Sequence, residues 1–114
     1  MNRDQNPRRN VFVSYSEKDR KIVEKILKDV LPEKEFYIYR GENTDSIKYL
    51  LTESIIDAIC RSEIYMVFIS AHSKNSKWVN TELEVIEQEN QKGRTTPIIF
   101  PVYLDEFTNF FWFD

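Results

Sequence analysis

The sequence predicts an α/β protein in which helices cover both faces of a parallel β-sheet. Strand-like apolar runs alternate with segments of helical periodicity in the order β-α-β-α-β-α-β. This alternation is typical of parallel sheets whose crossover helices pack on the two faces. The chain has 114 residues, of which 41% are hydrophobic, so it is long enough to form one domain with its own core.

Four short runs rich in β-branched and aromatic residues predict the strands. The third run is the most apolar and therefore predicts a central strand. The prolines of the fourth run favour a sheet edge or a strand terminus, because proline cannot donate to the ladder. The four predicted strands are Val11–Tyr15, Phe36–Tyr39, Ile64–Ile69 and Pro97–Tyr103.

The first predicted helix follows Ser16, which together with Asp19 comes close to a capping box. Pro32 ends this helix. Its apolar residues are predicted to lie on one face of the helix and are Ile22, Val23, Ile26, Leu27, Val30 and Leu31.

The second and third predicted helices have the same kind of apolar stripe. In the second helix the stripe is Ile47, Leu50, Leu51, Ile55, Ala58 and Ile59, and Cys60 near its end is predicted to be a small buried residue. The third helix follows a polar loop around Ser73 and fades near Gly93. Its stripe is Val79, Leu83 and Ile86.

The composition excludes several classes of protein. A net charge of −3 argues against a general nucleic-acid binder, which needs a basic patch. Cys60 and His72, each the single residue of its type, are too few for a disulfide framework or an ordinary Cys/His metal site. No apolar run is long enough to span a membrane and no signal peptide is present, so we expect a cytoplasmic protein. Residues 1–10 are expected to be a flexible lead-in to a domain over 11–114.

Trp78 and Glu82 are four residues apart and therefore share one face of the third helix. They neighbour the buried stripe, which predicts a position at the edge of the core. An aromatic plane beside a half-shielded carboxylate near a helix start is a plausible small-molecule site. The alternative interpretation is that Trp78 covers the core and that Glu82 is a solvated helix charge.

The fold class places a ligand near these two residues. In open parallel sheets, ligands bind outside the carboxyl ends of the strands at the topological switch point. Those ends are predicted to be Ser14–Ser16, Tyr39–Gly41 and Ser70–His72. The helix that carries Trp78 and Glu82 begins just beyond the last of them.

Three segments resemble the TIR (Toll/interleukin receptor) domain family. Val11-Phe12-Val13-Ser14-Tyr15-Ser16 with Asp19 resembles its first signature box. Trp78-Val79-Asn80-Thr81-Glu82 resembles its Trp-x-x-x-Glu segment, and Ile98–Val102 resembles the strand that follows. The resemblance implies a flavodoxin-like sheet with strand order 2-1-3-4-5. Some TIR domains are adaptors, and others cleave NAD with the Glu of this segment, which here is Glu82.

The sequence departs from the family pattern in two places. The loop that is Arg-Asp-x-x-Pro-Gly in receptor adaptors is Arg40-Gly41-Glu42-Asn43-Thr44-Asp45 here and has no proline, which weakens the adaptor interpretation. TIR domains usually continue to a full fifth strand and a last helix, so the domain is expected to be truncated or to lack them. The aromatic residues near its end are predicted to pack on the open sheet edge or on a neighbouring molecule or domain. They are Phe107, Phe110, Phe111, Trp112 and Phe113.

The chemistry of NAD cleavage fits a single carboxylate. Glycoside hydrolysis usually needs two, one of them to protonate the leaving group. The nicotinamide of NAD is a cationic pyridinium that leaves as a neutral molecule, so one carboxylate facing the oxocarbenium charge is enough. By resemblance, Glu82 is the catalytic residue. The candidate substrate-binding residues are Trp78, Ser14, Tyr15, Ser16, Arg40 and Lys77.

Two functions remain open at this point. The first is an NAD glycohydrolase in an antiphage or immune signalling effector, with NAD as substrate, no cofactor and no metal. The second is a non-catalytic module that scaffolds other TIR domains. The module would bind other TIR domains through the 40–47 loop, whose candidate interface residues are 40–45, and through helix surfaces. Both functions involve homo-oligomers or filaments and a fused sensor or effector domain. A phosphoacceptor receiver domain is disfavoured because the predicted ends of the first and third strands carry no Asp.

Overall fold

The computed structural model describes residues 9–40, 52–74 and 77–105, apart from the side chain of Trp78. The strands are β1 (Arg9–Ser14), β2 (Phe36–Arg40), β3 (Ile64–Ile69) and β4 (Ile98–Tyr103). The helices are α1 (Arg20–Val30), α2 (Glu53–Arg61), α3 (Ala71–Lys74) and α4 (Lys77–Gln91), and the 3-10 turn η1 (Glu17–Asp19) precedes α1. No helix within these described ranges is long and apolar enough to cross a membrane.

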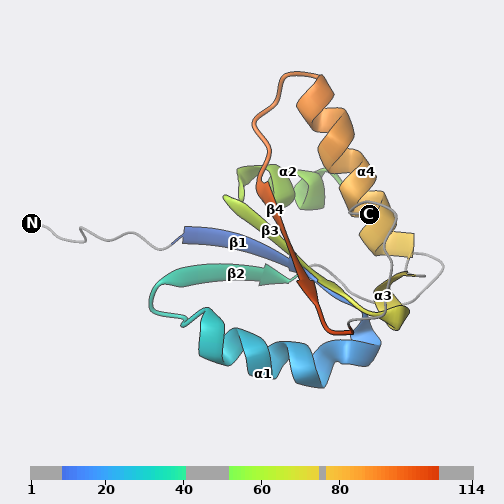
Figure 1. Ribbon diagram of the computed structural model, residues 1–114. Helices are drawn as coiled ribbons and strands as arrows, with labels where there is room; N and C mark the ends of the chain where they lie inside the picture. Colours follow the sequence, from blue (N-terminus) through green and yellow to red (C-terminus); the bar gives the residue numbers. More distant parts are fainter. Residues whose placement is uncertain (1–8, 41–51, 75–76, 106–114) are drawn as a thin grey trace, which may run out of the picture.

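The four strands form one parallel sheet in the order β2-β1-β3-β4, which confirms the predicted fold class. Phe12 of β1 lies opposite Tyr39 of β2 and Tyr65 of β3, which sets the register of the central strands. Helix α1 covers one face of the sheet, and α2 and α4 cover the other (Figure 1).

The core has two parts because side chains alternate between the faces of a strand. On the α1 face, Val11, Val13 and Phe68 pack against Val23 and Leu27. The other face, which we call the α4 face, buries a second group beneath α2 and α4. That group is Phe12, Ile55, Ile59, Tyr65, Val67, Ile69, Val79, Leu83 and Ile86.

Helix α1 buries a narrower stripe than its sequence predicts. Val23 and Leu27 are buried, whereas Ile22 is 48% exposed and Val30 is 55% exposed. Of the six apolar residues that the sequence places on one face, Ile22 and Val30 are therefore not buried. Val23 and Leu27 are four residues apart and lie on one narrow stripe of the helix. Ile22 and Val30 lie beside that stripe.

Several element boundaries also differ from the predictions. Strand β1 begins at Arg9, two residues early, because Arg9 and Asn10 still pair with β2. The predicted polar loop around Ser73 forms the short helix α3. Helix α2 is described from Glu53, with Thr52 as its N-cap. The predicted helical residues 47–51 and the aromatic tail 107–113 lie outside the described residues.

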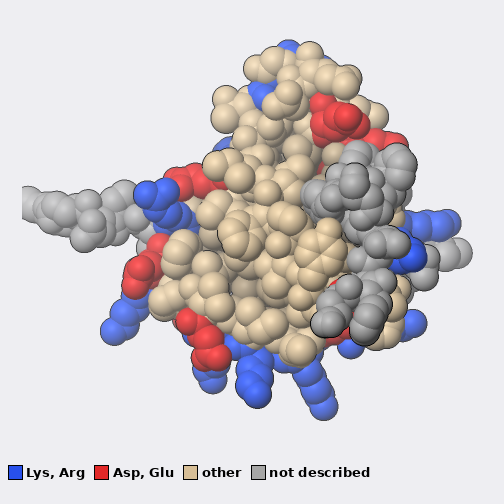
Figure 2. Space-filling model, viewed as in Figure 1, with Lys and Arg blue, Asp and Glu red and all other residues tan. Residues whose placement is uncertain are grey.

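Strand β4 lies at one edge of the described sheet, as its prolines predict. Ile98 and Leu104 donate their backbone N–H groups to Glu63 and Ile69 beside β3. By alternation, the nitrogen of Pro101 points away from β3, where it has no hydrogen to offer a further strand. Ile98 and Phe100 remain 72% and 51% exposed. Figure 2 shows a broad area without charged side chains on this side of the molecule, bordered by Lys and Arg along α1.

Candidate functional site

Glu82 lies inside the protein, on the α4 face of the sheet. Its side chain is 0% exposed, and its Oε1 accepts a hydrogen bond of 2.8 Å from the hydroxyl of Tyr65. The expected position at the edge of the core, with the carboxylate half shielded, is therefore wrong. Helix α4 begins at Lys77, and with a rise of about 1.5 Å per residue Glu82 lies more than one turn inward from the helix start.

The depth of Glu82 separates it from the mouth predicted at the strand ends. It meets the sheet at Tyr65, the second residue of β3, whereas the carboxyl end of that strand is Ile69. Lys77 and Trp78 lie in the first turn of α4, nearer that end. Lys77 is exposed, and the side chain of Trp78 lies outside the described part of the structure.

Ser14 is the second polar group on this face. It ends β1 opposite Val67 of β3, and by alternation it shares the α4 face with Phe12 and Val67. The residue is 0% exposed, and its Oγ has no hydrogen-bond partner among the described residues. A buried hydroxyl without a partner is uncommon in proteins, so Ser14 is kept as a candidate site residue.

Ser16, in contrast, has a local structural role. Its Oγ accepts a hydrogen bond of 3.3 Å from the backbone N–H of Lys18 and so caps η1. The predicted cap is confirmed, but Asp19 makes no reciprocal capping bond and turns elsewhere. Because Ser16 already accepts this bond and the hydroxyl of Ser14 has no partner among the described residues, Ser14 is the better candidate for substrate contact.

Asp19 ties together the ends of β1 and β3. Its Oδ2 accepts from the hydroxyl of Ser70 at 2.6 Å, and its Oδ1 lies 2.9 Å from Nδ1 of His72. The hydroxyl of Ser70 in turn accepts from the backbone N–H groups of His72 and Ser73 at the start of α3. His72 therefore lies in α3 and contacts Asp19. This cluster holds the two loops of the switch point in place.

Tyr15 and Arg40 lie on the opposite, α1 side of the sheet. Tyr15 is a core residue, 2% exposed, and its hydroxyl donates to Glu24 at 3.3 Å. Arg40 makes a two-pronged ion pair with Glu24 of α1, at 2.6 and 2.8 Å. These two predicted substrate-binding residues therefore lie on the opposite face of the sheet from Glu82 and Ser14. Gly41–Asp45 of the predicted interface loop lie outside the described residues.

The ion pair sets the charge of its two groups. The hydrogen bond from Arg40 lowers the pKa of Glu24 below its ordinary value of 4.5, and the same bond raises the pKa of Arg40. On the α4 side, burial raises the pKa of the Cys60 thiol, which is consistent with the predicted small buried residue and disfavours a reactive thiolate.

The Glu24–Arg40 pair is expected to stabilise the fold at neutral pH and to lose that effect in acid. Because folding lowers the pKa of Glu24, its contribution is present above pH 4.5 and is lost as the pH falls below that value. Both side chains are over one third exposed, so Glu24→Gln should cost at most about 1 kcal/mol at pH 7.

Urea unfolding of Glu24→Gln and wild type at pH 7 and at about pH 3 measures this contribution. Asp29→Asn, which neutralises an exposed acid on the same helix, is the control. A destabilisation by Glu24→Gln that is equally large at both pH values would show that it does not come from the ion pair.

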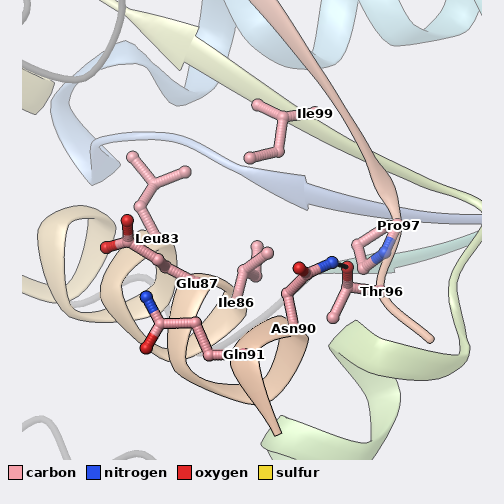
Figure 3. A pocket seen from close by; sticks show the side chains of 8 residues that line it. All are labelled: Leu83, Ile86, Glu87, Asn90, Gln91, Thr96, Pro97 and Ile99. Carbon is pink, nitrogen blue, oxygen red and sulfur yellow. Dashed lines mark hydrogen bonds between the residues drawn. The ribbon is translucent and has the colours of Figure 1, made fainter. Parts of the chain in front are cut away.

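A groove of about 480 Å³ lies between α4 and β4. Leu83, Ile86 and Ile99 line its apolar wall, and Asn90 donates to Thr96 across 3.0 Å (Figure 3). Its lining lies along the later turns of α4 and the first residues of β4, and it includes neither Glu82 nor Ser14. This groove is therefore separate from the candidate site.

Sequence reasoning missed two members of the site region. Tyr65, the hydrogen-bond donor to Glu82, stands in an otherwise aliphatic part of the most apolar strand, and a hydroxyl in that run was a signal for a buried polar partner. Asp19 was noted only as a capping acid, although it reaches Ser70, which is 51 residues away.

Comparison with known proteins agrees with this architecture. A family model described as TIR domain matches residues 11–114. The chain is also similar to a solved structure titled "Structure of the activated Roq1 resistosome directly recognizing the pathogen effector XopQ (TIR domains)", with a TM-score of 0.60 and 25% identity. The similarity covers 83% of this chain and 57% of that one, so this chain spans little more than half of its length. No curated protein matches the chain. Because the family model spans nearly the whole sequence, the chain belongs to the TIR domain family.

Proposed function

We propose that this TIR domain cleaves NAD at the bond between nicotinamide and ribose, with Glu82 as the catalytic carboxylate. The observation that carries the proposal is the burial of the Glu82 carboxylate, which is expected to lower the stability of the fold. Burying a carboxylate in an apolar core is expensive, and Glu82 is 0% exposed among Tyr65, Val79 and Leu83. Perturbed, buried titratable groups cluster at functional sites.

The reaction needs little else from the protein. The bond from the ribose C1′ to the pyridinium nitrogen breaks with both electrons going to nitrogen, which leaves neutral nicotinamide. The positive charge that develops on the ribose faces the Glu82 carboxylate, which stabilises it electrostatically. Water then adds to C1′ and releases a proton, giving ADP-ribose. An attack by the adenine base of the same molecule instead of water would give a cyclic product.

We propose that Ser14 contacts the substrate on the same face of the sheet as Glu82. Both lie on the α4 face of the sheet, and the hydroxyl of Ser14 has no partner among the described residues. A ribose or phosphate oxygen of NAD would satisfy that hydroxyl. Trp78 is proposed to stack on a flat ring of the dinucleotide and Lys77 to lie near the pyrophosphate, because both occupy the first turn of the same helix.

We further propose that this structure is a closed state of the site. A substrate cannot reach a carboxylate that is 0% exposed, so cleavage requires a rearrangement around it. The similar structure is titled as the TIR domains of an activated resistosome that recognises a pathogen effector. By analogy, we propose that this chain acts in immune or antiphage signalling and opens its site when it assembles with other TIR domains.

The second candidate function is a TIR–TIR interaction module without chemistry. One observation favours it: Glu82 is buried and hydrogen-bonded to Tyr65, which is also how a purely structural carboxylate is satisfied. Nicotinamide release from NAD by the purified protein distinguishes the two functions. An interaction module would release none at any protein concentration.

Specific activity is expected to rise at least about ten-fold over a wide range of protein concentration. The dilute chain should be mostly monomeric and closed, and a shift of that size corresponds to about 1.4 kcal/mol supplied by assembly. The measurement is nicotinamide release per molecule across a dilution series, followed together with light scattering. High, constant specific activity from a monomer would contradict the role of assembly.

A matched pair of variants tests the contribution of Arg40 to that rise. Arg40→Ala and Glu24→Ala break the same ion pair, but only Arg40→Ala removes the arginine that begins the predicted interface loop. Arg40→Ala should blunt the rise, whereas Glu24→Ala should not. Equal behaviour of the two variants would assign the effect to the ion pair within one chain.

A further inference from the structure

The hydrogen bond between Tyr65 and Glu82 joins two polar groups inside an apolar core. Both residues are 0% exposed, and the hydroxyl of Tyr65 lies 2.8 Å from Oε1 of Glu82. Their apolar neighbours on this face include Val67, Val79 and Leu83. We propose that Tyr65 is a positioning residue, which holds the Glu82 carboxylate in one orientation and in its charged form. This inference rests on the proposed function of Glu82.

Tyr65 is itself held firmly. Its ring stacks on Phe12 with centroids 5.7 Å apart and an angle of 19°, and Phe12 stacks on Tyr39 at 5.0 Å and 25°. The three residues lie opposite one another in the registers of β2, β1 and β3, so their rings form a row across the sheet. Cross-strand aromatic pairs of this kind stabilise a sheet and restrict the rings. The hydroxyl of Tyr65 therefore has a defined place.

The hydroxyl affects both the orientation and the charge of Glu82. A hydrogen bond that favours the ionised form of an acid opposes the effect of burial, which favours the neutral form. The proposed reaction needs the ionised form, because only a negative charge stabilises the developing oxocarbenium ion. Phenylalanine at position 65 would keep the ring that stacks on Phe12 and remove the hydroxyl, so Tyr65→Phe tests the role of the hydroxyl.

Other titratable side chains lie on the elements around this core. They include Asp57 and Cys60 on α2, Lys77, Glu84 and Glu87 on α4, and Tyr103 on β4. Apart from Cys60, these side chains are exposed. All of them are unchanged in Tyr65→Phe, so a change in pH dependence on this substitution reports on the loss of the Tyr65 hydroxyl.

The first test compares Tyr65→Phe with Ser62→Ala. The control also removes a buried hydroxyl that makes a hydrogen bond of 2.8 Å, in this case to the backbone of Ala58. Tyr65→Phe should lower kcat about ten-fold with little change in KM, and move the acid limb of the pH–rate profile upward by about one unit. Ser62→Ala should change neither. Unchanged kcat and acid limb in Tyr65→Phe would overturn the proposal.

The second test does not depend on catalysis. Carbon-13 NMR follows the titration of the Glu82 carboxyl carbon, assigned by the loss of its signal in Glu82→Gln, in wild type and in Tyr65→Phe. The midpoint should be higher in Tyr65→Phe, and equal midpoints would overturn the inference. If wild type releases no nicotinamide, the proposed function fails, but this titration still decides whether Tyr65 keeps Glu82 charged.

Discussion

Glu82→Gln is expected to abolish nicotinamide release, with a loss of at least about 100-fold in kcat. The amide has nearly the size of the carboxylate, and its oxygen can still accept the hydrogen bond from Tyr65. The substitution therefore replaces the carboxylate by a neutral amide of nearly the same shape, which exchanges one oxygen for a donating NH2 group. Because Glu82 is buried, the free energy of unfolding should change by at most about 2 kcal/mol, more than an exposed helix position would allow.

The control for Glu82→Gln is Glu84→Gln, which makes the same chemical change at an exposed position of α4. Kinetics should be measured at a protein concentration where wild type is active, and urea unfolding should confirm that both variants are folded. Glu84→Gln should match wild type in both measurements. Wild-type turnover by a folded Glu82→Gln would remove Glu82 from the mechanism.

Phe12→Ala is expected to have the largest effect on stability, costing about 3–5 kcal/mol. Phe12 is 0% exposed in the central strand β1, and its ring stacks on both Tyr39 and Tyr65. The substitution would leave a cavity beneath α2 and α4 and would also release the ring of Tyr65. Since the free energy of unfolding of a small domain is only about 5–15 kcal/mol, this substitution would remove a large part of it.

Phe100→Ala is the matched control for Phe12→Ala. It removes the same side chain from β4, where Phe100 is 51% exposed. Its cost should be about 1 kcal/mol or less, because water already reaches much of the ring. Urea unfolding of the three proteins, with an unchanged slope, measures the difference. Equal costs at the two positions would contradict the assignment of Phe12 to the core.

The alternation of strands and helices could be predicted because it depends on local sequence patterns. The continuous apolar run Ile64–Ile69 predicts a strand that is buried on both faces, and it forms β3 with the predicted bounds. Pro101 predicts an edge strand because a proline nitrogen cannot join a ladder on both sides, and β4 is at an edge of the described sheet. Both features can be predicted from a residue and its near neighbours in the sequence.

The depth of Glu82 could not be predicted in the same way. Helical periodicity gives the angle of a side chain around its own helix, and Glu82 lies beside the stripe of Val79, Leu83 and Ile86. Whether that flank is covered depends on which elements pack against it. Here β3 brings Tyr65 to the carboxylate, and the side chain is fully buried.

The sequence by itself determined the fold class, the parallel sheet and the choice of Glu82 as the candidate residue, because each follows from local periodicity or from a short motif. Only the tertiary structure decided that Glu82 is buried, that Arg40 forms an ion pair with Glu24, and that Asp19 joins the loops after β1 and β3. Those contacts link residues 16 to 53 positions apart, and such distances close only when the strands take their places in the sheet.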